Sequence, residues 1–285
     1  MKIIRKIRSK YSLSVILSIL IIFIFSGCQK VINVDLNDAS PHIVIEGLIT
    51  NRTGPYTVMI SKSGSYFNQP VLPQVSGAVV IITDDMGTAD TLKETKPGIY
   101  LTSKTRGIPG RTYTMRVLSE NKEYMGSSTM HSYVGIDSLN LMKSQSGHFG
   151  FGGDNNDKID IELHCFFKDP DEKNFYRIKV VKNDSIRAED YRLYDDQYTN
   201  GQGTDLRVAH VAAGDTVRVE LYSLDKQIFS YYRTLEDLLN TNPLFGSTPA
   251  NPNTNLNNGA LGYFSACAIS SKTIIVTESL VNALK

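Results

Sequence analysis

The sequence predicts a mainly β protein with two folded domains and one amphipathic helix. From Pro41 onward, short runs of alternating apolar and polar residues recur at spacings of roughly ten residues, with turn-forming residues between them. One segment, residues 225–240, instead has apolar residues at helical spacing. Glycine and polar residues fill the stretch GHFGFGGDNND at 147–157, so a domain boundary or a long loop is expected there.

The first 27 residues are typical of a bacterial lipoprotein signal peptide. Lysine and arginine are frequent among the first ten residues, residues 13–25 are almost uninterruptedly apolar, and two small residues precede Cys28. The apolar stretch is shorter than the roughly 20 residues that span a hydrocarbon core. We therefore expect cleavage before Cys28, lipidation of that cysteine and a tether over residues 28–40. An ordinary secretory signal with an incidental cysteine, or a short N-terminal anchor, is the alternative.

Seven runs over residues 41–133 suit an immunoglobulin-like β-sandwich. Residues two apart in a strand share one face, so each alternating run can bury one side. Residues 84–87 and 119–122 have the turn chemistry of tight hairpins, and residues 107–110 mark a loop before a strand. The seven runs are IVIEGLIT (43–50), YTVMIS (56–61), AVVIIT (78–83), ADTLKE (89–94), GIYLTS (98–103), TYTMRVLS (112–119) and EYMGSST (123–129).

Residues 134–285 are expected to form the second, β-rich domain. A strand at 134–142 leads into it, and the runs at 159–167 and 175–182 predict a hairpin through the turn KDPDEKN. A further strand is expected at 215–224, where Val, Val and Leu alternate with polar residues.

Asp225 follows as a candidate N-cap of the helix that ends near residue 240. Prolines and asparagines then exclude regular structure up to about residue 259. ALGYFSACAI (260–269) and KTIIVTE (272–278) are two further strand candidates.

Composition and cysteine usage bound the function. The formal net charge is +1, and several basic residues belong to the leader, so nucleic acid is not expected as a partner. Besides Cys28, the chain has Cys165 and Cys267, which lie in an oxidising compartment if the leader is used. A disulfide between them and two buried thiols both fit this pattern.

Motifs for catalysis, cofactors and metals are missing from the sequence. The five histidines are dispersed, and HExxH, GxSxG, CxxC, GxxxxGK and GxGxxG patterns do not occur. DDQYTNGQGTD resembles a calcium loop, but its ligand register fails, and KDPDEKN fits a turn better than an acid–base carboxylate pair. We therefore expect no enzyme activity, metal or cofactor. A hydrolase with two facing carboxylates and no motif is the remaining enzymatic alternative.

Two segments are candidate surfaces for a ligand or partner, because irregular loops on a β scaffold often carry recognition. The first is the polar, aromatic stretch 191–204, and the second is 242–263. The candidate residues are Tyr191, Tyr194, Tyr198, Asn242 and Tyr263.

Several segments together resemble a Bacteroidetes-type outer-membrane lipoprotein family, the domain of unknown function 4249. They span residues 28–270 in the order of the family: the leader ending at Cys28, then IVIEGLITNRTGPYTVMIS, SGAVVIITDDMG, GIPGRTYTMRV, FKDPDEKNFYRIKV and NPNTNLNNGALGYFSA. The resemblance implies an outer-membrane lipoprotein with an N-terminal immunoglobulin-like domain, often encoded beside a TonB-dependent receptor. It implies no catalytic residue, and only the lipidated Cys28 is transferred.

The expected function is therefore binding rather than turnover. We expect an outer-membrane lipoprotein that is accessory to a TonB-dependent transporter, through ligand capture or docking on the barrel. An adhesion or envelope-assembly lipoprotein without a small-molecule ligand is the alternative. The residue after the cysteine is not aspartate, which fits sorting to the outer membrane. The membrane leaflet stays open, because residues 29–32 contain no acidic cluster of the kind that marks surface export.

Overall fold

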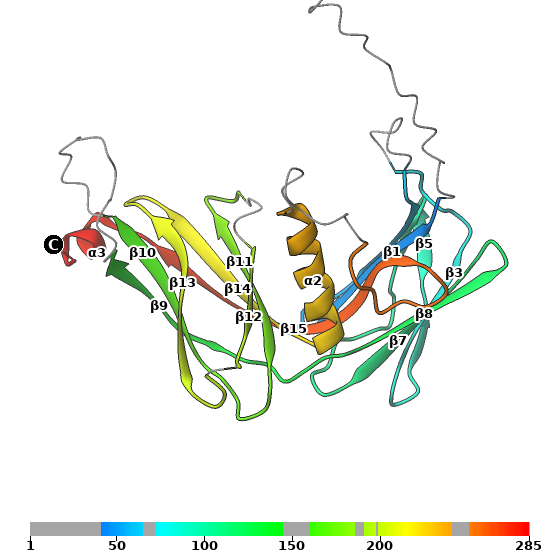
Figure 1. Ribbon diagram of the computed structural model, residues 1–285, viewed down its shortest axis with the longest axis horizontal. Helices are drawn as coiled ribbons and strands as arrows, with labels where there is room; N and C mark the ends of the chain where they lie inside the picture. Colours follow the sequence, from blue (N-terminus) through cyan, green and yellow to red (C-terminus); the bar gives the residue numbers. More distant parts are fainter. Residues whose placement is uncertain are drawn as a thin grey trace, which may run out of the picture. The chain divides into compact units, whose positions relative to one another are not determined.

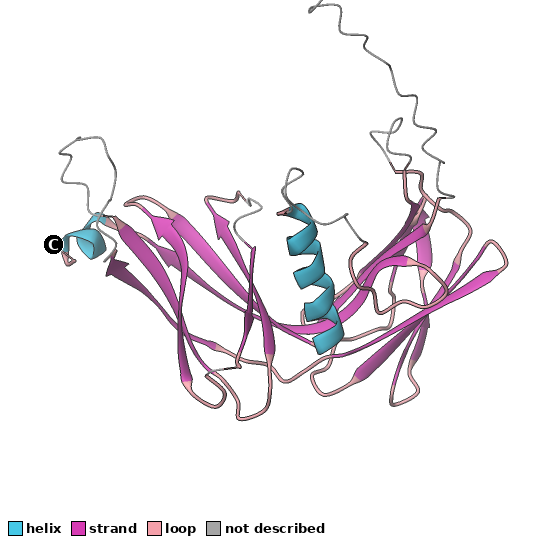
Figure 2. Ribbon diagram, in the orientation of Figure 1, coloured by secondary structure: helices cyan, strands magenta, loops and turns pink. Residues whose placement is uncertain are grey.

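The computed structural model describes residues 41–64, 72–144, 160–185, 191–197, 199–240 and 251–284. These residues belong to one compact unit, Ser40–Lys285, whereas the leader and Cys28 lie outside the described residues. Strands hold 54% of the described residues and helices 9%, so the chain is mainly β, as predicted (Figures 1 and 2). Within the described ranges, no helix has the length and apolar character needed to cross a membrane.

The first core lies between two groups of four strands. One group is the sheet β4-β3-β7-β8, and the other is the part β1-β2-β6-β5 of an eight-stranded sheet. Buried residues of both groups form one apolar cluster, in which Ile45 and Val58 pack with Met115 and others. The strands are β1 (Ile43–Thr50), β2 (Thr57–Lys62), β3 (Val79–Asp84), β4 (Ala89–Thr91), β5 (Lys93–Lys96), β6 (Ile99–Leu101), β7 (Thr112–Ser119) and β8 (Lys122–Thr129).

The predicted single strand at 89–94 is two strands in different sheets. β4 pairs with β3, whereas β5 pairs with β6. Between them, Leu92 is buried in the first core, and its N–H donates to the carbonyl of Val80. The alternation of the sequence is therefore real, but the chain crosses from one sheet to the other at Leu92.

The second core lies between the sheet β13-β10-β9 and the other part of the eight-stranded sheet, β12-β11-β14-β15. Its buried residues include Leu163 and Phe167 from one side and Ile178 and Leu221 from the other. The strands are β9 (Ile136–Lys143), β10 (Ile161–Lys168), β11 (Phe175–Lys182), β12 (Tyr191–Asp195), β13 (Gly203–Val211), β14 (Thr216–Leu224) and β15 (Leu261–Ile275).

The predicted hairpin between the runs at 159–167 and 175–182 is wrong. β10 pairs with β9 and β13, whereas β11 pairs with β12 and β14, so the two strands lie in different sheets. The turn between them crosses the edge of the second core and is held by buried Asp169. The carboxylate of Asp169 accepts hydrogen bonds from the hydroxyl of Tyr176 and from the N–H of Gly201.

The two predicted C-terminal strands are one strand of 15 residues, β15. Its first part, Leu261 to Cys267, pairs in parallel with β1, and its second part, Ala268 to Ile275, pairs antiparallel with β14. Ser270 and Ser271, where the prediction placed a break, continue the register opposite Leu221 and Glu220. β15 therefore belongs to the walls of both cores.

The predicted helix is α2 (Lys226–Leu239), with Asp225 as N-cap and Asn240 as C-cap. The carboxylate of Asp225 accepts a hydrogen bond from the N–H of Ile228 at 2.9 Å. Ile228 packs with Cys267 and Ile269 in a third cluster, which covers the face of β15 under the helix. A short C-terminal helix, α3 (Glu278–Asn282), was not predicted, and Thr277 caps it.

Candidate binding pocket

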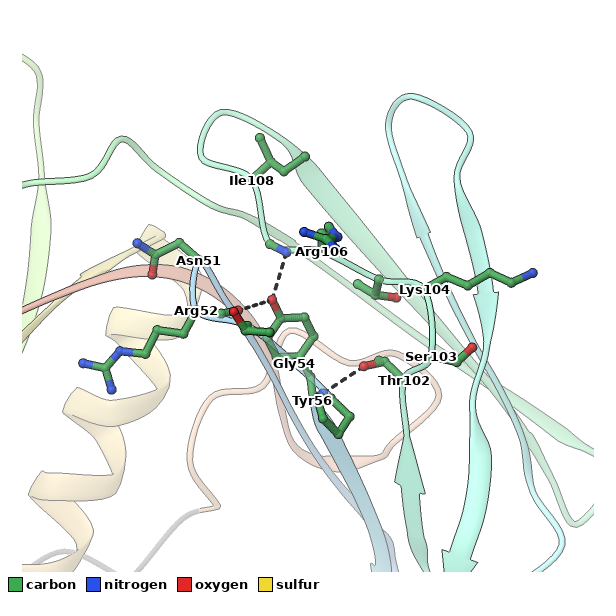
Figure 3. Close-up of a pocket in the computed structure, with 13 residues that line it drawn as sticks. Asn51, Arg52, Gly54, Tyr56, Thr102, Ser103, Lys104, Arg106 and Ile108 are labelled. Atoms are coloured by element: carbon green, nitrogen blue, oxygen red, sulfur yellow. Dashed lines mark hydrogen bonds between the residues drawn. The ribbon is translucent and has the colours of Figure 1, made fainter.

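A pocket of about 650 Å³ lies between two loops of the first core (Figure 3). One wall is the loop from β1 to β2, and the other is the chain that leaves β6 toward β7. The lining residues are Asn51, Arg52, Thr53, Gly54, Pro55, Tyr56, Thr102, Ser103, Lys104, Thr105, Arg106, Gly107 and Ile108. This volume falls within the roughly 300–1,000 Å³ that is typical of small-molecule sites.

Tyr56 joins the two walls. Its hydroxyl donates to the carbonyl of Arg52 at 2.6 Å and accepts from the N–H of Gly107 at 3.1 Å. Its own N–H donates to the side-chain oxygen of Thr102 at 2.8 Å. Figure 3 shows these three bonds converging on the tyrosine. The peptide bond before Pro55 in the first wall is cis. The spacing between the walls is thus fixed by a buried side chain.

Asp90 holds the start of the second wall from behind. Its carboxylate accepts hydrogen bonds from the N–H groups of Ser103, Lys104 and Thr105, at 2.6 to 2.8 Å. The hydroxyls of Ser103 and Thr105 also donate to it. Burial alone would raise the pKa of Asp90, but these hydrogen bonds outweigh it and lower the pKa to about 2. Asp90 is therefore an ionised anchor of the loop at neutral pH.

Tyr113 and Gly107 fix the end of the same wall. The hydroxyl of buried Tyr113 donates to the carbonyl of Arg106 at 2.7 Å and accepts from the N–H of Ile108 at 2.8 Å. A Cβ at Gly107 would lie 1.9 Å from the carbonyl oxygen of Thr50, so only glycine permits this close approach. Both walls are thus held in place by the first core beneath them.

The charged side chains that line the pocket are Arg52, Lys104 and Arg106; no carboxylate lines it. Arg52 turns aside and forms an ion pair with Glu220 at 3.1 Å. Lys104 and Arg106 are exposed, and neither forms an ion pair with a carboxylate in the described part of the chain. The pocket therefore has a net positive rim.

The structure places two of the predicted surface tyrosines in packing positions. Tyr194 is half-buried, lies 6.3 Å from Phe167 and 6.2 Å from Tyr176 between ring centroids, and bonds the hydroxyl of Thr199. Tyr263 packs against Tyr231 beneath α2 at 4.8 Å between ring centroids. These two side chains stabilise the fold.

The other predicted surface residues are only partly described. Tyr191 begins strand β12, which replaces the start of the expected loop 191–204. Tyr198 and Asn242 lie outside the described residues. The tyrosine-rich segment therefore contributes a strand edge rather than the open loop that the sequence indicated.

The described part of the asparagine-rich segment, residues 251–260, runs along β8 and is joined to it by side-chain hydrogen bonds. The Asn255 side chain donates to the carbonyls of Ser127 and Phe264 and accepts from the N–H of Phe264. Asn257 exchanges bonds with the backbone of Met125. These amides satisfy backbone groups, so they are committed to structure rather than to a ligand.

Cys165 and Cys267 are both free and buried, which corrects the candidate disulfide. Cys165 lies in the second core and Cys267 in the cluster beneath α2. Burial raises the pKa of each thiol to about 12, so both are neutral and poorly reactive in the folded protein. The alternative of two buried thiols is the observed one.

The acidic turn around Asp169 contains a pair of buried carboxylates, Asp169 and Asp196. Burial raises the pKa of Asp169, and the neighbouring Asp196 adds to the rise. Asp196 accepts a hydrogen bond from the N–H of Asn174, so both groups hold the turn. No group of three or more His, Cys, Asp or Glu side chains in the described ranges could hold a metal ion.

Sequence reasoning missed the pocket altogether. It identified residues 107–110 only as a loop before a strand. The available signal was two basic residues, Lys104 and Arg106, between hydroxyl residues in SKTRG. These basic residues indicate a pocket only if the loop 51–56 lies opposite them. The two loops are about fifty positions apart in the chain, so the sequence does not show that they meet.

The fold and the pocket define a β-rich protein with a polar cavity between loops at one end of a strand pair. The sequence profile described as Domain of unknown function (DUF4249) matches residues 29–273, and the chain belongs to this family. The match begins directly after Cys28 and includes the first core and most of the second. No curated protein shows significant sequence similarity to the chain.

Proposed function

We propose that the protein is a non-enzymatic lipoprotein of the outer membrane, accessory to a TonB-dependent transporter. It captures ligand or docks on the barrel while acyl chains on Cys28 hold it at the bilayer. The observation that carries the membrane tether of this proposal is the order of segments in the chain. A leader ends at Cys28, and a compact unit begins at Ser40. Acyl chains contribute about 0.8 kcal/mol per buried methylene, which is sufficient for a tether with two or more chains.

The architecture proposed for the membrane-proximal part is an immunoglobulin-like sandwich over residues 41–133. Support comes from two packed groups of four short strands around one core, within a length of about 100 residues. β15 adds a further strand beside β1, and this addition belongs to the second domain, 134–285, in the proposed division.

The lipid tether is tested first, because the rest of the proposal depends on it. The native protein is purified from membranes in detergent and its N-terminal peptide is analysed by mass spectrometry, beside a Cys28→Ala variant. We expect an acylated cysteine at the new N-terminus of the native protein, and a variant that is not acylated and keeps its apolar leader. An Asn37→Ala variant, also in the tether, is the control and should be cleaved and acylated like the native protein. An intact leader or an unmodified thiol would overturn the tether.

The transporter partnership is tested by affinity purification of the lipoprotein from solubilised outer membrane at native expression. Recovery of a TonB-dependent barrel in stoichiometric amount supports the proposal. Recovery of the lipoprotein without a barrel contradicts it and favours the adhesion or assembly alternative. Protease shaving of intact cells distinguishes a surface-exposed from a periplasm-facing position.

A further inference from the structure

We propose that the pocket between the loop 51–56 and the loop 102–108 binds a phosphate-bearing compound of about the size of a sugar phosphate. The compound is either soluble or the headgroup of a lipid, and the phosphate is the chemistry that the two sources share. This inference specifies the ligand-capture arm of the proposed function and rests on it, but it does not require the lipid on Cys28.

The positive charges on the rim of the pocket favour an anionic ligand. Lys104 and Arg106 belong to the 102–108 wall and have no ion-pair partner among the described residues, while Arg52 pairs with Glu220, a carboxylate that Lys179 and Arg218 also approach. Exposed cations without partners gain from a bound anion, because charge-assisted hydrogen bonds are stronger than neutral ones. A bound anion therefore balances the positive charges of Lys104 and Arg106.

The walls of the pocket are held by hydrogen bonds, which favours ligand binding. Loops that must be ordered on binding lose affinity through entropy, whereas loops that are already ordered do not. The 102–108 wall is held by Asp90 and Tyr113 at its two ends, and Tyr56 bonds it to the opposite wall. The carboxylate of Asp90 is not among the groups that line the pocket, and five hydrogen bonds from the loop stabilise its negative charge.

The size and lining of the cavity indicate the rest of the ligand. A volume of about 650 Å³ exceeds what an isolated inorganic anion fills. The lining also includes the hydroxyl residues Thr53, Ser103 and Thr105, beside the amphipathic Tyr56 and the apolar Pro55 and Ile108. The hydroxyls of Ser103 and Thr105 donate to Asp90. Hydroxyl oxygens can accept hydrogen bonds from a polyol even while they donate elsewhere. A phosphate with an attached sugar or glycerol satisfies both parts of the lining.

The ligand class is tested by isothermal titration of the native, detergent-solubilised protein. The probes are glucose 6-phosphate, glucose, gluconate, inorganic phosphate and dihexanoyl phosphatidic acid. We expect glucose 6-phosphate or the short-chain lipid to bind at least tenfold more tightly than glucose and gluconate. Binding of the sugar phosphate alone assigns a soluble source, and binding of the lipid alone assigns a headgroup. Equal binding of glucose, preferential binding of gluconate or no binding of either phosphate compound overturns the inference.

The location is tested with a charge-matched pair of variants. Lys104→Gln with Arg106→Gln removes two charges from the pocket, and we expect affinity to fall by at least about tenfold. Lys93→Gln with Lys96→Gln removes two exposed charges from β5, outside the pocket, and should change affinity less than about twofold. A similar loss in both pairs would show that binding follows net charge, which overturns the assignment. Thermal melts of both variants confirm that they are folded.

The two proposals fail separately. If a transporter is recovered with the protein but no phosphate compound binds, only the ligand inference is wrong. If the phosphate binds at the pocket but no transporter is recovered, the partnership is wrong and the site stands.

Discussion

Asp90 is the residue on which the shape of the pocket depends most directly. It is 3% exposed and accepts hydrogen bonds from three backbone N–H groups and two hydroxyls of Ser103, Lys104 and Thr105. An asparagine there keeps one acceptor oxygen but loses the charge and the second oxygen. The loop would then have unsatisfied donors next to the core.

We predict that Asp90→Asn lowers the free energy of unfolding by about 2 kcal/mol at pH 7. This magnitude follows from the pKa of Asp90, which is lowered from 3.8 to about 2 in the folded protein. Because the folded-state pKa is depressed, this contribution is complete above about pH 4 and is lost as the pH falls through 2. At pH 3 about half of the difference should persist. Urea denaturation at the two pH values measures it, with Glu172→Gln as an exposed control. An equal difference at both pH values would contradict the ionised anchor.

Gly262 permits the parallel contact between β15 and β1. Its φ is +91°, and a Cβ there would lie 2.1 Å from the carbonyl oxygen of Ile45. We predict that Gly262→Ala costs at least about 3 kcal/mol, because backbone strain and a clash with backbone add. Gly77→Ala has a similar φ of +76° but nothing within 4 Å, so it should cost only about 1 kcal/mol. Equal losses in urea denaturation would mean that β15 can shift away from β1.

Single residues were predictable where local chemistry determines their role. Asp225 was predicted as a helix cap from its position before an amphipathic run, and it is one. The part played by Asp90 was not predictable, because its donors lie thirteen to fifteen positions further along the chain and reach it only after the loop has folded over β4. The roles of Tyr56 and Gly107 in the pocket were not predictable for the same reason.

Helix α2 is fixed at its start by hydrogen bonds that connect its N-cap to β8 and β15. Asp225 accepts from the N–H of Ile228 and also from the hydroxyl of Ser128, and that hydroxyl accepts from the N–H of Ala266. We predict that Asp225→Ala lowers the free energy of unfolding by about 1–2 kcal/mol, since the cap is lost together with a contact to β8. Asp225→Asn keeps an acceptor and should lose clearly less. If the alanine variant unfolds in the same urea range as the native protein, the cap is not a stabilising contact.

Strands were predicted best where the residues on one face are buried and those on the other face are more exposed to solvent. The bounds expected for β1, β7 and β11 agree with the structure, because a buried residue recurs at every second position over most of each strand. β12 and β13 were missed, since the stretch between them is rich in glycine, asparagine and aspartate and the alternation is weak. Pairing could not be predicted from periodicity, and so β10 and β11 were wrongly joined as a hairpin.

The whole molecule is organised around β15. Because this strand supplies buried residues such as Phe264 and Ala266 to the first core and lies beside β14 in the second, neither core is complete without it. The sequence predicted two strands here and two domains, and the domain boundary at 133/134 stays a prediction. The continuous register from Leu261 to Ile275 favours a single cooperative unit.

Cooperative unfolding is therefore the outcome we expect for residues 40–285. Leu221→Ala removes a fully buried side chain from the second core and should lower the free energy of unfolding by about 3 kcal/mol. Native-state hydrogen exchange should then show the slowest amides of β1, in the first core, losing protection by the same amount, because global opening limits both. Ile82→Ala in the first core should act reciprocally on β11. If each substitution leaves protection in the other core unchanged, the two cores unfold independently and β15 can detach from one while it stays paired in the other.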